Sequence, residues 1–476
     1  MQAAIPPSPS SQGWSRAFQD LPREHGFEPL RVEGTIPAEL RGTLYRNGPS
    51  LFSSFGESYR HWFDGDGAVS AVRLEGGKAE GAVRLVQTQE LVAERAAGRR
   101  LYANYCMPHP GSLLGRIGQM RSKNVANTSV MVWNDRLFAL YEAGIPVELS
   151  MEDLSTIGET TFDGLLSAAF SAHPHRIPSR RASYNFGMRF GRHTLLDLFE
   201  LRDDGGARRI ASLPLPGPTL LHDFIATERH LIFFVSPVRL RVMRQLLGVG
   251  TVGENFVWRP ELGTEVLVVP LDEPERPFRF QVDPFFQWHF ANAFEQGESI
   301  VVDLVRYPDF ETNLWLGDRV RGGSGREARG TFHRAIVDPR RSVLRMEERW
   351  SESCEFPRVA PSATGKPYRF AWLGAHAPGS RRDLYDQLAR LDVESGEARR
   401  VELPAGHYPS EPIFVHKAGS AAEDDGWILT LVYDARAHQS HLAILDSKRL
   451  DDGPIARAYF DHHVPFTFHG GWLGAK

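Results

Sequence analysis

Residues 427–435 (WILTLVYDA) and 441–447 (HLAILDS) are two runs of apolar and β-branched residues with five polar or small residues between them. Such a pair is typical of two strands joined by a turn. Similar runs, bounded by turn residues, recur along the chain at residues 136–144, 195–206, 230–237, 264–274, 298–309 and 330–339. No helical segments of 10–15 residues alternate with them, as a parallel sheet requires. The sequence therefore predicts an all-β fold.

The domain organisation follows from the even spacing of these runs. The 44 glycines and 32 prolines punctuate the chain throughout, and no change in composition divides it. Many four-stranded units in one long domain indicate a β-propeller, but no tight repeat of about 40 residues sets the number of blades. The first 20 residues are rich in Pro, Ser and Gln. We expect residues 1–25 to form a flexible arm and residues 26–476 to form a single propeller domain.

Charge and cysteine content exclude several classes of protein. The 55 Lys and Arg residues against 59 Asp and Glu residues give a net charge of −4, so no global basic field favours nucleic acid as a partner. Cys106 and Cys354 are too few for a disulfide framework or a thiolate zinc site. The sequence also lacks a signal-like start and an apolar run of about 18 residues. We therefore expect a cytoplasmic protein that does not span a membrane.

Two segments depart from the strand pattern. In residues 236–248 (SPVRLRVMRQLLG) a helix beginning at Ser-Pro would place Leu240, Met243 and Leu247 on one face, with arginines elsewhere. Residues 111–121 (GSLLGRIGQMR) repeat this pattern. The pattern fits surface helices packed on the propeller, and it also fits basic amphipathic helices that rest in a bilayer interface.

Four of the 18 histidines lie in apolar or aromatic surroundings: His173, His222, His289 and His469. Any one alone fits a hydrogen-bonded core histidine. A propeller, however, brings residues that are distant in sequence to one central axis, so four isolated histidines can converge on a metal. The closer pairs 438/441 and 462/463 have conventional metal-ligand spacing, but their polar surroundings predict solvated side chains.

An all-imidazole site suits zinc, copper, nickel or iron, so the ligand type does not identify the metal. Neutral ligands leave the charge of the ion uncompensated, which predicts carboxylates that accept the second ring N–H of each histidine. Glu142, Glu355 and Glu411 lie in apolar settings and are the candidates.

Several motifs together resemble the carotenoid cleavage oxygenase family, from about residue 30 to the end of the chain. They are, in order, GTLYRNGPSLF (42–52), HWFDGDGAVSAVRL (61–74), NVANTSVMVWNDRLFALYEAGIP (124–146), SAHP (171–174), LLHDFIAT (220–227), WHFANAFE (288–295), CEFPRV (354–359), SEPIFV (410–415) and the paired runs at 427–447. Within that family they are most similar to the bacterial apocarotenoid oxygenases. The resemblance implies a seven-bladed propeller with a metal on its axis and a cap of loops and short helices.

The resemblance also implies a role for each candidate residue. One Fe(II) per chain is expected on the four histidines, with His173 rather than His175 taking the role in the SAHP motif. The three glutamates are expected to support three of the ligands and to leave the first one to solvent. Thr128 is expected to place its methyl group over one open iron position. Tyr141, Leu220, Trp288 and Phe356 match substrate-lining positions, where Tyr141 replaces a tryptophan typical of the family.

The implied activity is cleavage of a C=C bond of a carotenoid or apocarotenoid by O2, giving two carbonyl products such as retinal. The substrate would be an apolar polyene taken from a membrane, so segments 111–121 and 236–248 are expected to make peripheral membrane contact. Three alternatives remain open: a stilbene-cleaving dioxygenase, which uses a lysine where this chain has Tyr141, a retinoid isomerohydrolase, and a non-enzymatic propeller that binds a carotenoid.

Overall fold

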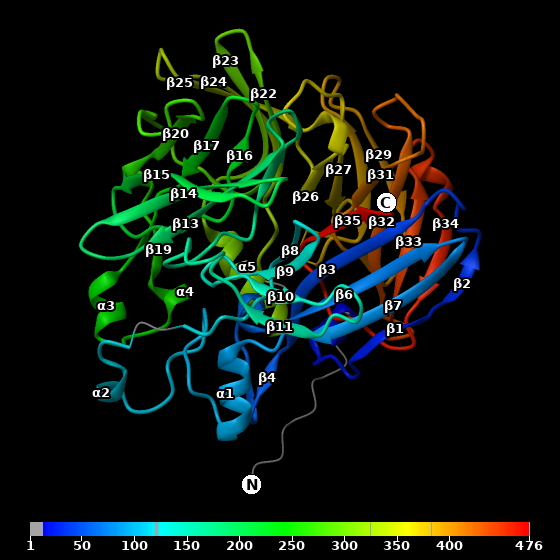
Figure 1. Cartoon of the computed structure of the whole chain (residues 1–476), viewed down its shortest axis with the longest axis horizontal. Helices are drawn as coiled ribbons and strands as arrows, with labels where there is room; N and C mark the ends of the chain where they lie inside the picture. The colour runs from blue at the N-terminus through cyan, green and yellow to red at the C-terminus, as the bar shows by residue number, and fades with distance from the viewer. Residues whose placement is uncertain (1–12, 120–121, 324, 382, 476) are drawn as a thin grey trace.

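A computed structural model describes residues 13–119, 122–323, 325–381 and 383–475. Its strands form seven sheets of four or more strands, which are the blades of a propeller (Figure 1). This arrangement confirms the predicted fold class and number of blades.

The first three blades contain the following strands in spatial order. The first runs β1 (His25–Pro29), β7 (Lys78–Leu85), β6 (Asp66–Glu75), β3 (Gly42–Leu51) and β35 (Gly470–Gly474). The second runs β11 (Thr156–Glu159), β10 (Val147–Leu149), β9 (Arg136–Leu140) and β8 (Ser129–Trp133). The third runs β12 (His175–Ile177), β13 (Ala182–Arg189), β14 (Thr194–Arg202) and β15 (Ala207–Leu215).

The remaining blades follow around the ring. The fourth runs β16 (Ile225–Ala226), β17 (His230–Val235), β20 (Thr264–Pro270) and β21 (Phe278–Val282). The fifth runs β22 (Phe286–Gln296), β23 (Ser299–Tyr307), β24 (Thr331–Asp338) and β25 (Val343–Trp350). The sixth runs β26 (Cys354–Val359), β27 (Phe370–Ala375), β28 (Gln387–Asp392) and β29 (Ala398–Glu402). The seventh runs β2 (Arg31–Gly34), β34 (Pro454–Tyr459), β33 (Gln439–Asp446), β32 (Gly426–Asp434) and β30 (His407–Pro409), with β31 (Ile413–His416) also paired to β32.

Short elements complete the chain. Two small sheets pair β4 (Ser53–Ser54) with β5 (Glu57–Ser58) and β18 (Val238–Leu240) with β19 (Phe256–Trp258). The α-helices are α1 (Gln89–Ala97), α2 (Leu113–Arg116), α3 (Val242–Leu246), α4 (Val252–Asn255) and α5 (Glu311–Val320). The 3₁₀ helices are η1 (Gly13–Phe18), η2 (Trp62–Asp64), η3 (Pro178–Arg180), η4 (Pro260–Leu262), η5 (Pro361–Ala363) and η6 (Leu450–Asp452).

The run at 427–447 shows why the strands are apolar along their whole length. β32 and β33 form an antiparallel pair in which Thr430 lies opposite Ala443. Eight of the nine residues of β32 are buried, because neighbouring blades cover both faces of each sheet. A strand covered on both faces has no solvent side to carry polar residues, so its sequence does not alternate.

Both ends of the chain close the ring. The C-terminal strand β35 pairs with β3, with Gly470 opposite Arg46, and β2 pairs with β34, so early and late strands lie side by side (Figure 1). A Cβ at Gly470 would lie 2.3 Å from the carbonyl oxygen of Tyr45, so this close approach of two backbones requires glycine.

The flexible arm predicted for residues 1–25 is wrong for the part that the structure describes. In η1 the side chain of Trp14 is completely buried, and Phe18 packs against Trp62 and Phe466. Two aromatic residues in a polar, Pro-rich segment thus anchor it to the propeller. Residues 1–12 of this prediction lie outside the described residues.

The two predicted amphipathic helices are shorter than expected. Segment 236–248 begins as strand β18, because its backbone pairs with β19, and only Val242–Leu246 is helical. Segment 111–121 contains the four-residue helix α2, and residues 120 and 121 lie outside the described residues. Pairing with a neighbouring strand has overridden the local helical pattern.

The cap lies over the central axis. Helices α5 and η2 contribute Thr312, Trp315, Trp62 and Phe63 to the lining of the central cavity, as the predicted cap of loops and short helices requires. No helix within the described ranges is long and apolar enough to span a bilayer.

Candidate metal centre

Each of the seven blades brings at least one predicted site residue to the axis, at or near the start of its innermost strand. Thr128 directly precedes β8, His173 precedes β12, His222 precedes β16, His289 lies in β22, Glu355 lies in β26, Glu411 precedes β31 and His469 directly precedes β35. The inner strands of a propeller surround its axis, so residues far apart in sequence meet there.

The four histidines converge. One ring nitrogen from each lies within 4.8 Å of the others, and this is the one such group of metal-ligating side chains within the described parts of the chain. Nε2 of His222 lies 3.0 Å from Nε2 of His173 and 3.3 Å from Nε2 of His289. Metal–nitrogen bonds of about 2.1 Å at right angles place two nitrogens about 3.0 Å apart. The spacing of these imidazoles therefore fits a single metal ion.

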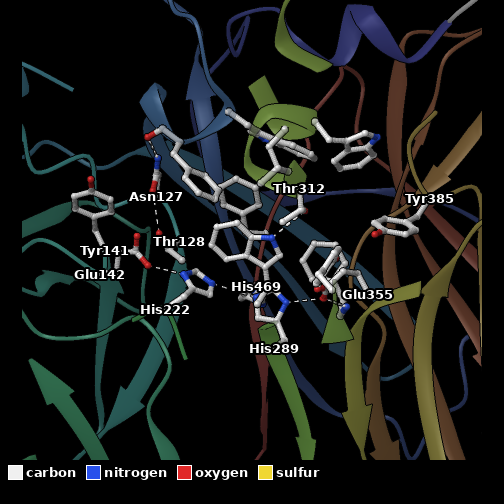
Figure 2. Close-up of a pocket in the computed structure, with 18 residues that line it drawn as sticks. Asn127, Thr128, Tyr141, Glu142, His222, His289, Thr312, Glu355, Tyr385 and His469 are labelled. Atoms are coloured by element: carbon white, nitrogen blue, oxygen red, sulfur yellow. Dashed lines mark hydrogen bonds and ion pairs between the residues drawn. The ribbon is translucent and has the colours of Figure 1, made fainter. Parts of the chain in front are cut away.

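Three carboxylates determine the tautomers of three of these rings, and Figure 2 shows two of them, Glu142 and Glu355. Nδ1 of His222 donates to Glu142 at 2.5 Å, and Nδ1 of His289 donates to Glu355 at 2.6 Å. In the same way, Nδ1 of His469 donates to Glu411 at 2.9 Å. With the proton on Nδ1, each Nε2 carries a lone pair directed at the common centre. Lone pairs that converge in this way repel one another unless a cation lies between them.

Burial favours the neutral form of two of the imidazoles, those of His173 and His469. It lowers the pKa of His173 well below its usual value, and the imidazoles of His222, His469, His289 and His175 add to this effect. Burial also lowers the pKa of His469 to about 3, although Glu411 opposes the shift. For His289 burial acts in the same direction, but Glu355 outweighs it and the pKa rises. Nδ1 of His173 has no hydrogen-bond partner among the described residues, and His173 lines a polar cavity.

An apolar cavity of about 70 Å³ lies against three of the four histidines, His222, His289 and His469, beneath the cap (Figure 2). Tyr141, Trp288 and Phe356, three of the four predicted substrate-lining residues, line it. Trp288 is held in place because its Nε1 donates to Oγ1 of Thr312 at 3.1 Å. The prediction that Leu220 lines the substrate site is wrong. Its side chain is buried in the hydrophobic core with Trp288 and lines neither this cavity nor the polar one.

Thr128 lies on the cavity wall with its hydroxyl already in use. Its Oγ1 donates to Oδ1 of Asn127 at 3.0 Å, and Nδ2 of Asn127 donates to the carbonyl oxygen of Gly65 at 2.7 Å. The methyl group is therefore the part of the side chain that remains for the cavity. Ala126, two residues before Thr128, has a φ of 41°, a strained conformation of the kind that clusters at functional sites.

A polar cavity of about 260 Å³ lies on the other side of the histidines, lined by His173, His175, Arg358 and Glu411 among others. Phe356 borders both cavities, and its ring stacks on His289 with centroids 5.5 Å apart. Its φ of 55° is also strained.

Sequence reasoning missed several polar residues around the ligands. Asp223 accepts hydrogen bonds from Nε2 of His175 at 2.9 Å and from the backbone N–H of Phe290 at 3.2 Å, so it joins the segments that carry His173, His222 and His289. Arg46 and Arg358 contact Glu411. Asp223, Arg46 and Arg358 lie inside the motifs at 220–227, 42–52 and 354–359. A charged residue within a largely apolar motif is the sequence feature that could have identified each of them.

The other close histidine pairs do not form a metal site in the described ranges. His441 and His463 are buried, so the prediction that these pairs are solvated is wrong for them. His463 instead stacks on His438 with centroids 4.1 Å apart.

Comparisons with known proteins agree with this geometry. Residues 18–474 match the profile of the family described as retinal pigment epithelial membrane protein. The chain is 35% identical over 477 residues to the apocarotenoid-15,15'-oxygenase of Synechocystis sp., covering 97% of this chain and 96% of that protein. It is 30% identical over 496 residues to lignostilbene-alpha,beta-dioxygenase isozyme III of Sphingomonas paucimobilis, covering 98% of each. Cobalt-substituted apocarotenoid oxygenase from Synechocystis superposes with a TM-score of 0.89 at 32% identity, covering 97% of this chain and 98% of that one.

The fold and the site define a seven-bladed propeller with an all-histidine group on its axis that could hold a metal. The chain belongs to the family of the retinal pigment epithelial membrane protein and the carotenoid cleavage oxygenases. The resemblance identified from the motifs is thereby confirmed.

Proposed function

We propose that this chain is an Fe(II)-dependent dioxygenase that cleaves a C=C bond of an apocarotenoid with O2, giving two carbonyl products. The observation that carries the proposal is the carboxylate-supported histidine group placed directly against an apolar cavity. The similarity to an apocarotenoid-15,15'-oxygenase supports the substrate class.

His173, His222, His289 and His469 would hold the iron. Ferrous iron supplies the capacity to bind and partly reduce O2, which a redox-inert zinc lacks. Glu142, Glu355 and Glu411 orient three of the rings through their Nδ1–H groups. Both atoms of O2 enter the products, one in each carbonyl group, so the reaction needs neither an external reductant nor an acid–base pair.

The aromatic wall has the tasks of positioning the substrate and excluding water. Phe63 packs edge-to-face on Trp288 at 5.6 Å and on Phe468 at 5.7 Å, and all three rings line the cavity. Ligand sites for molecules of drug size have volumes of about 300–1,000 Å³. The cavity of about 70 Å³ is smaller than this, so we expect its lining side chains to move apart as a polyene binds. We assign to the methyl group of Thr128 the role of limiting the room for small molecules beside the histidines.

The decisive test incubates iron-loaded protein with apocarotenoids of several chain lengths and with resveratrol-like stilbenes, in air and under nitrogen. We expect two carbonyl products from apocarotenoids in air only, identified by mass spectrometry. Turnover under nitrogen would contradict the oxygenase proposal, and cleavage of stilbenes alone would contradict the substrate proposal.

One observation favours stilbene cleavage as the second candidate. Tyr141 lines the apolar cavity, and its hydroxyl has no hydrogen-bond partner among the described residues. A phenol in that position can form a hydrogen bond with a hydroxyl of an aromatic substrate.

We also propose peripheral membrane contact through segments 111–121 and 236–248. The two segments lie side by side, because the backbone N–H of Gly118 donates to the carbonyl oxygen of Leu246 at 2.9 Å. Leu114 is 81% exposed and Met243 is 67% exposed, and Leu113, Ile117 and Leu247 are exposed beside them. Apolar side chains gathered on a surface with nearby arginines suit the interface of a bilayer.

Sedimentation with vesicles of neutral and anionic phospholipid tests this contact. We expect Leu114→Asp combined with Met243→Asp to reduce the bound fraction several-fold. Val343→Asp replaces an exposed apolar residue of strand β25 and serves as the matched control. Equal binding of all three proteins would remove these segments from the proposal.

A further inference from the structure

The three carboxylates that support the histidines accept hydrogen bonds from different numbers and kinds of donor. Glu142 receives only the Nδ1–H of His222, at 2.5 Å, among the described donors. Glu355 receives the Nδ1–H of His289 at 2.6 Å together with two neutral donors, the hydroxyl of Tyr307 at 2.9 Å and the backbone N–H of Phe356 at 2.6 Å.

Glu411 is shared with two cations. Nε of Arg358 donates to its Oε1 at 2.8 Å, and this same oxygen accepts the Nδ1–H of His469 at 2.9 Å. Nη1 of Arg46 and the backbone N–H of Gly470 both donate to Oε2 at 2.9 Å. Burial lowers the pKa of Arg46 to about 10, so its guanidinium remains charged at neutral pH.

A carboxylate that already accepts charged donors is a weaker acceptor for the next one, because its negative charge is partly neutralised. The contact from carboxylate to imidazole lengthens in the same order, from 2.5 Å at Glu142 to 2.6 Å at Glu355 and 2.9 Å at Glu411. Although burial alone would raise the pKa of Glu411, Arg358, His469 and Arg46 hold it far below its usual value. The four imidazoles therefore differ in electron donation: His222 is supported most strongly, His469 only weakly, and His173 by no carboxylate.

We propose that Arg358 is a positioning residue that acts through Glu411 to weaken the support of His469 and thereby keeps the bound iron in its ferrous form. The inference rests on the proposed iron cofactor and goes beyond it, because it assigns the control of the Fe(III)/Fe(II) reduction potential to one arginine. A weaker carboxylate makes His469 a less basic ligand, which disfavours the more highly charged ferric ion. The positive charge of Arg358 near the centre acts in the same direction.

Arg358 is the arginine that can be changed without emptying the core. Its side chain is 39% exposed at the polar cavity, whereas that of Arg46 is 2% exposed. Removing Arg46 would leave Glu411 next to an empty space in the interior. A change in the midpoint potential of the iron could then not be separated from a change in the stability of the fold.

The experiment measures the one-electron Fe(III)/Fe(II) midpoint potential of iron-loaded protein by a redox titration followed by electron paramagnetic resonance. We expect Arg358→Gln to raise the ferric-to-ferrous ratio at a fixed potential at least tenfold, which is a midpoint about 59 mV lower. Arg358→Lys keeps the charge and is expected to stay within about threefold of the wild-type ratio. Arg176→Gln is the matched control, because Arg176 lines the same cavity but pairs with Asp203 at 2.7 Å.

Two results overturn the inference: an unchanged midpoint in Arg358→Gln at full iron content, or an equal shift in Arg358→Lys. If Arg358→Gln loses iron, Tyr307→Phe takes its place, since it removes one neutral donor from Glu355 and keeps the ring. In Tyr307→Phe the midpoint potential is expected to fall, and the ferric-to-ferrous ratio at a fixed potential is expected to rise by less than tenfold. An unchanged midpoint potential would overturn the proposed order in which the carboxylates support the imidazoles. Wild-type protein that takes up no iron would instead contradict the proposed function.

Discussion

The two cavities that meet at the four histidines differ in chemistry. The one beneath the cap is walled by aromatic rings such as Trp288 and Phe63, and the other is lined by charged groups including Arg358 and Glu411. Phe356 separates them. Under the proposed function, one ligand set would serve two tasks: the apolar side would keep water from the reacting substrate, and the polar side would adjust the charge around the metal.

The largest expected effect concerns the histidines that the two cavities share. His469→Ala is expected to abolish iron retention in a folded propeller, because His469 borders both cavities and its Nε2 faces the common centre. Metal analysis and circular dichroism measure the two properties.

His175→Gln is the matched control, since His175 lines the polar cavity alone and lies outside the converging group. We expect it to retain iron. Full iron occupancy in His469→Ala would remove that residue from the ligand set. Deleting the last eight residues removes His469 and strand β35 together and is expected to abolish iron binding as well.

A second prediction compares the carboxylates on the two sides. Glu411→Gln is expected to lower the free energy of unfolding of the metal-free protein by about 3–5 kcal/mol, because it leaves the buried guanidinium of Arg46 without its counter-charge. Glu142 lies at the apolar cavity, and Glu142→Gln changes one charge-assisted hydrogen bond into a neutral one, so a loss of about 1 kcal/mol is expected. Urea denaturation measures both, and equal losses would show that the charge difference between the two sides is unimportant for stability.

The smallest expected effect lies within the apolar cavity. Tyr141→Phe removes a hydroxyl that has no partner among the described residues, so apocarotenoid cleavage is expected to change less than twofold in kcat/KM. For a hydroxystilbene substrate the same change is expected to lower kcat/KM about tenfold, which corresponds to one hydrogen bond of about 1.4 kcal/mol. A tenfold loss with apocarotenoids would mean that the phenol binds the polyene substrate or its oxygen-bearing end.

Particular residues show how far the sequence could predict this site. His173, His222, His289 and His469 were identified because an imidazole in an apolar motif is unusual, and the structure brings all four together. Leu220 was misplaced because sequence position does not reveal toward which neighbour a side chain turns in a segment without regular structure.

Local patterns also failed where a distant partner decides the conformation. Residues 238–240 have a helical pattern but pair with β19, and the polar segment around Trp14 is ordered because its aromatic rings find a place between Trp62 and Phe466. Neither partner is close in sequence, so no local periodicity could have indicated the contact.

Local composition and the residue types within motifs were enough to predict the strand-rich fold and the candidate ligands. Only the tertiary structure decided that Glu411 is shared by Arg46 and Arg358, that Glu142 is not, and that the histidines face two different cavities. The physical reason is that hydrogen bonding and electrostatic interactions act over a few ångströms in space. The order in which seven blades close around the axis determines which charges come within that range.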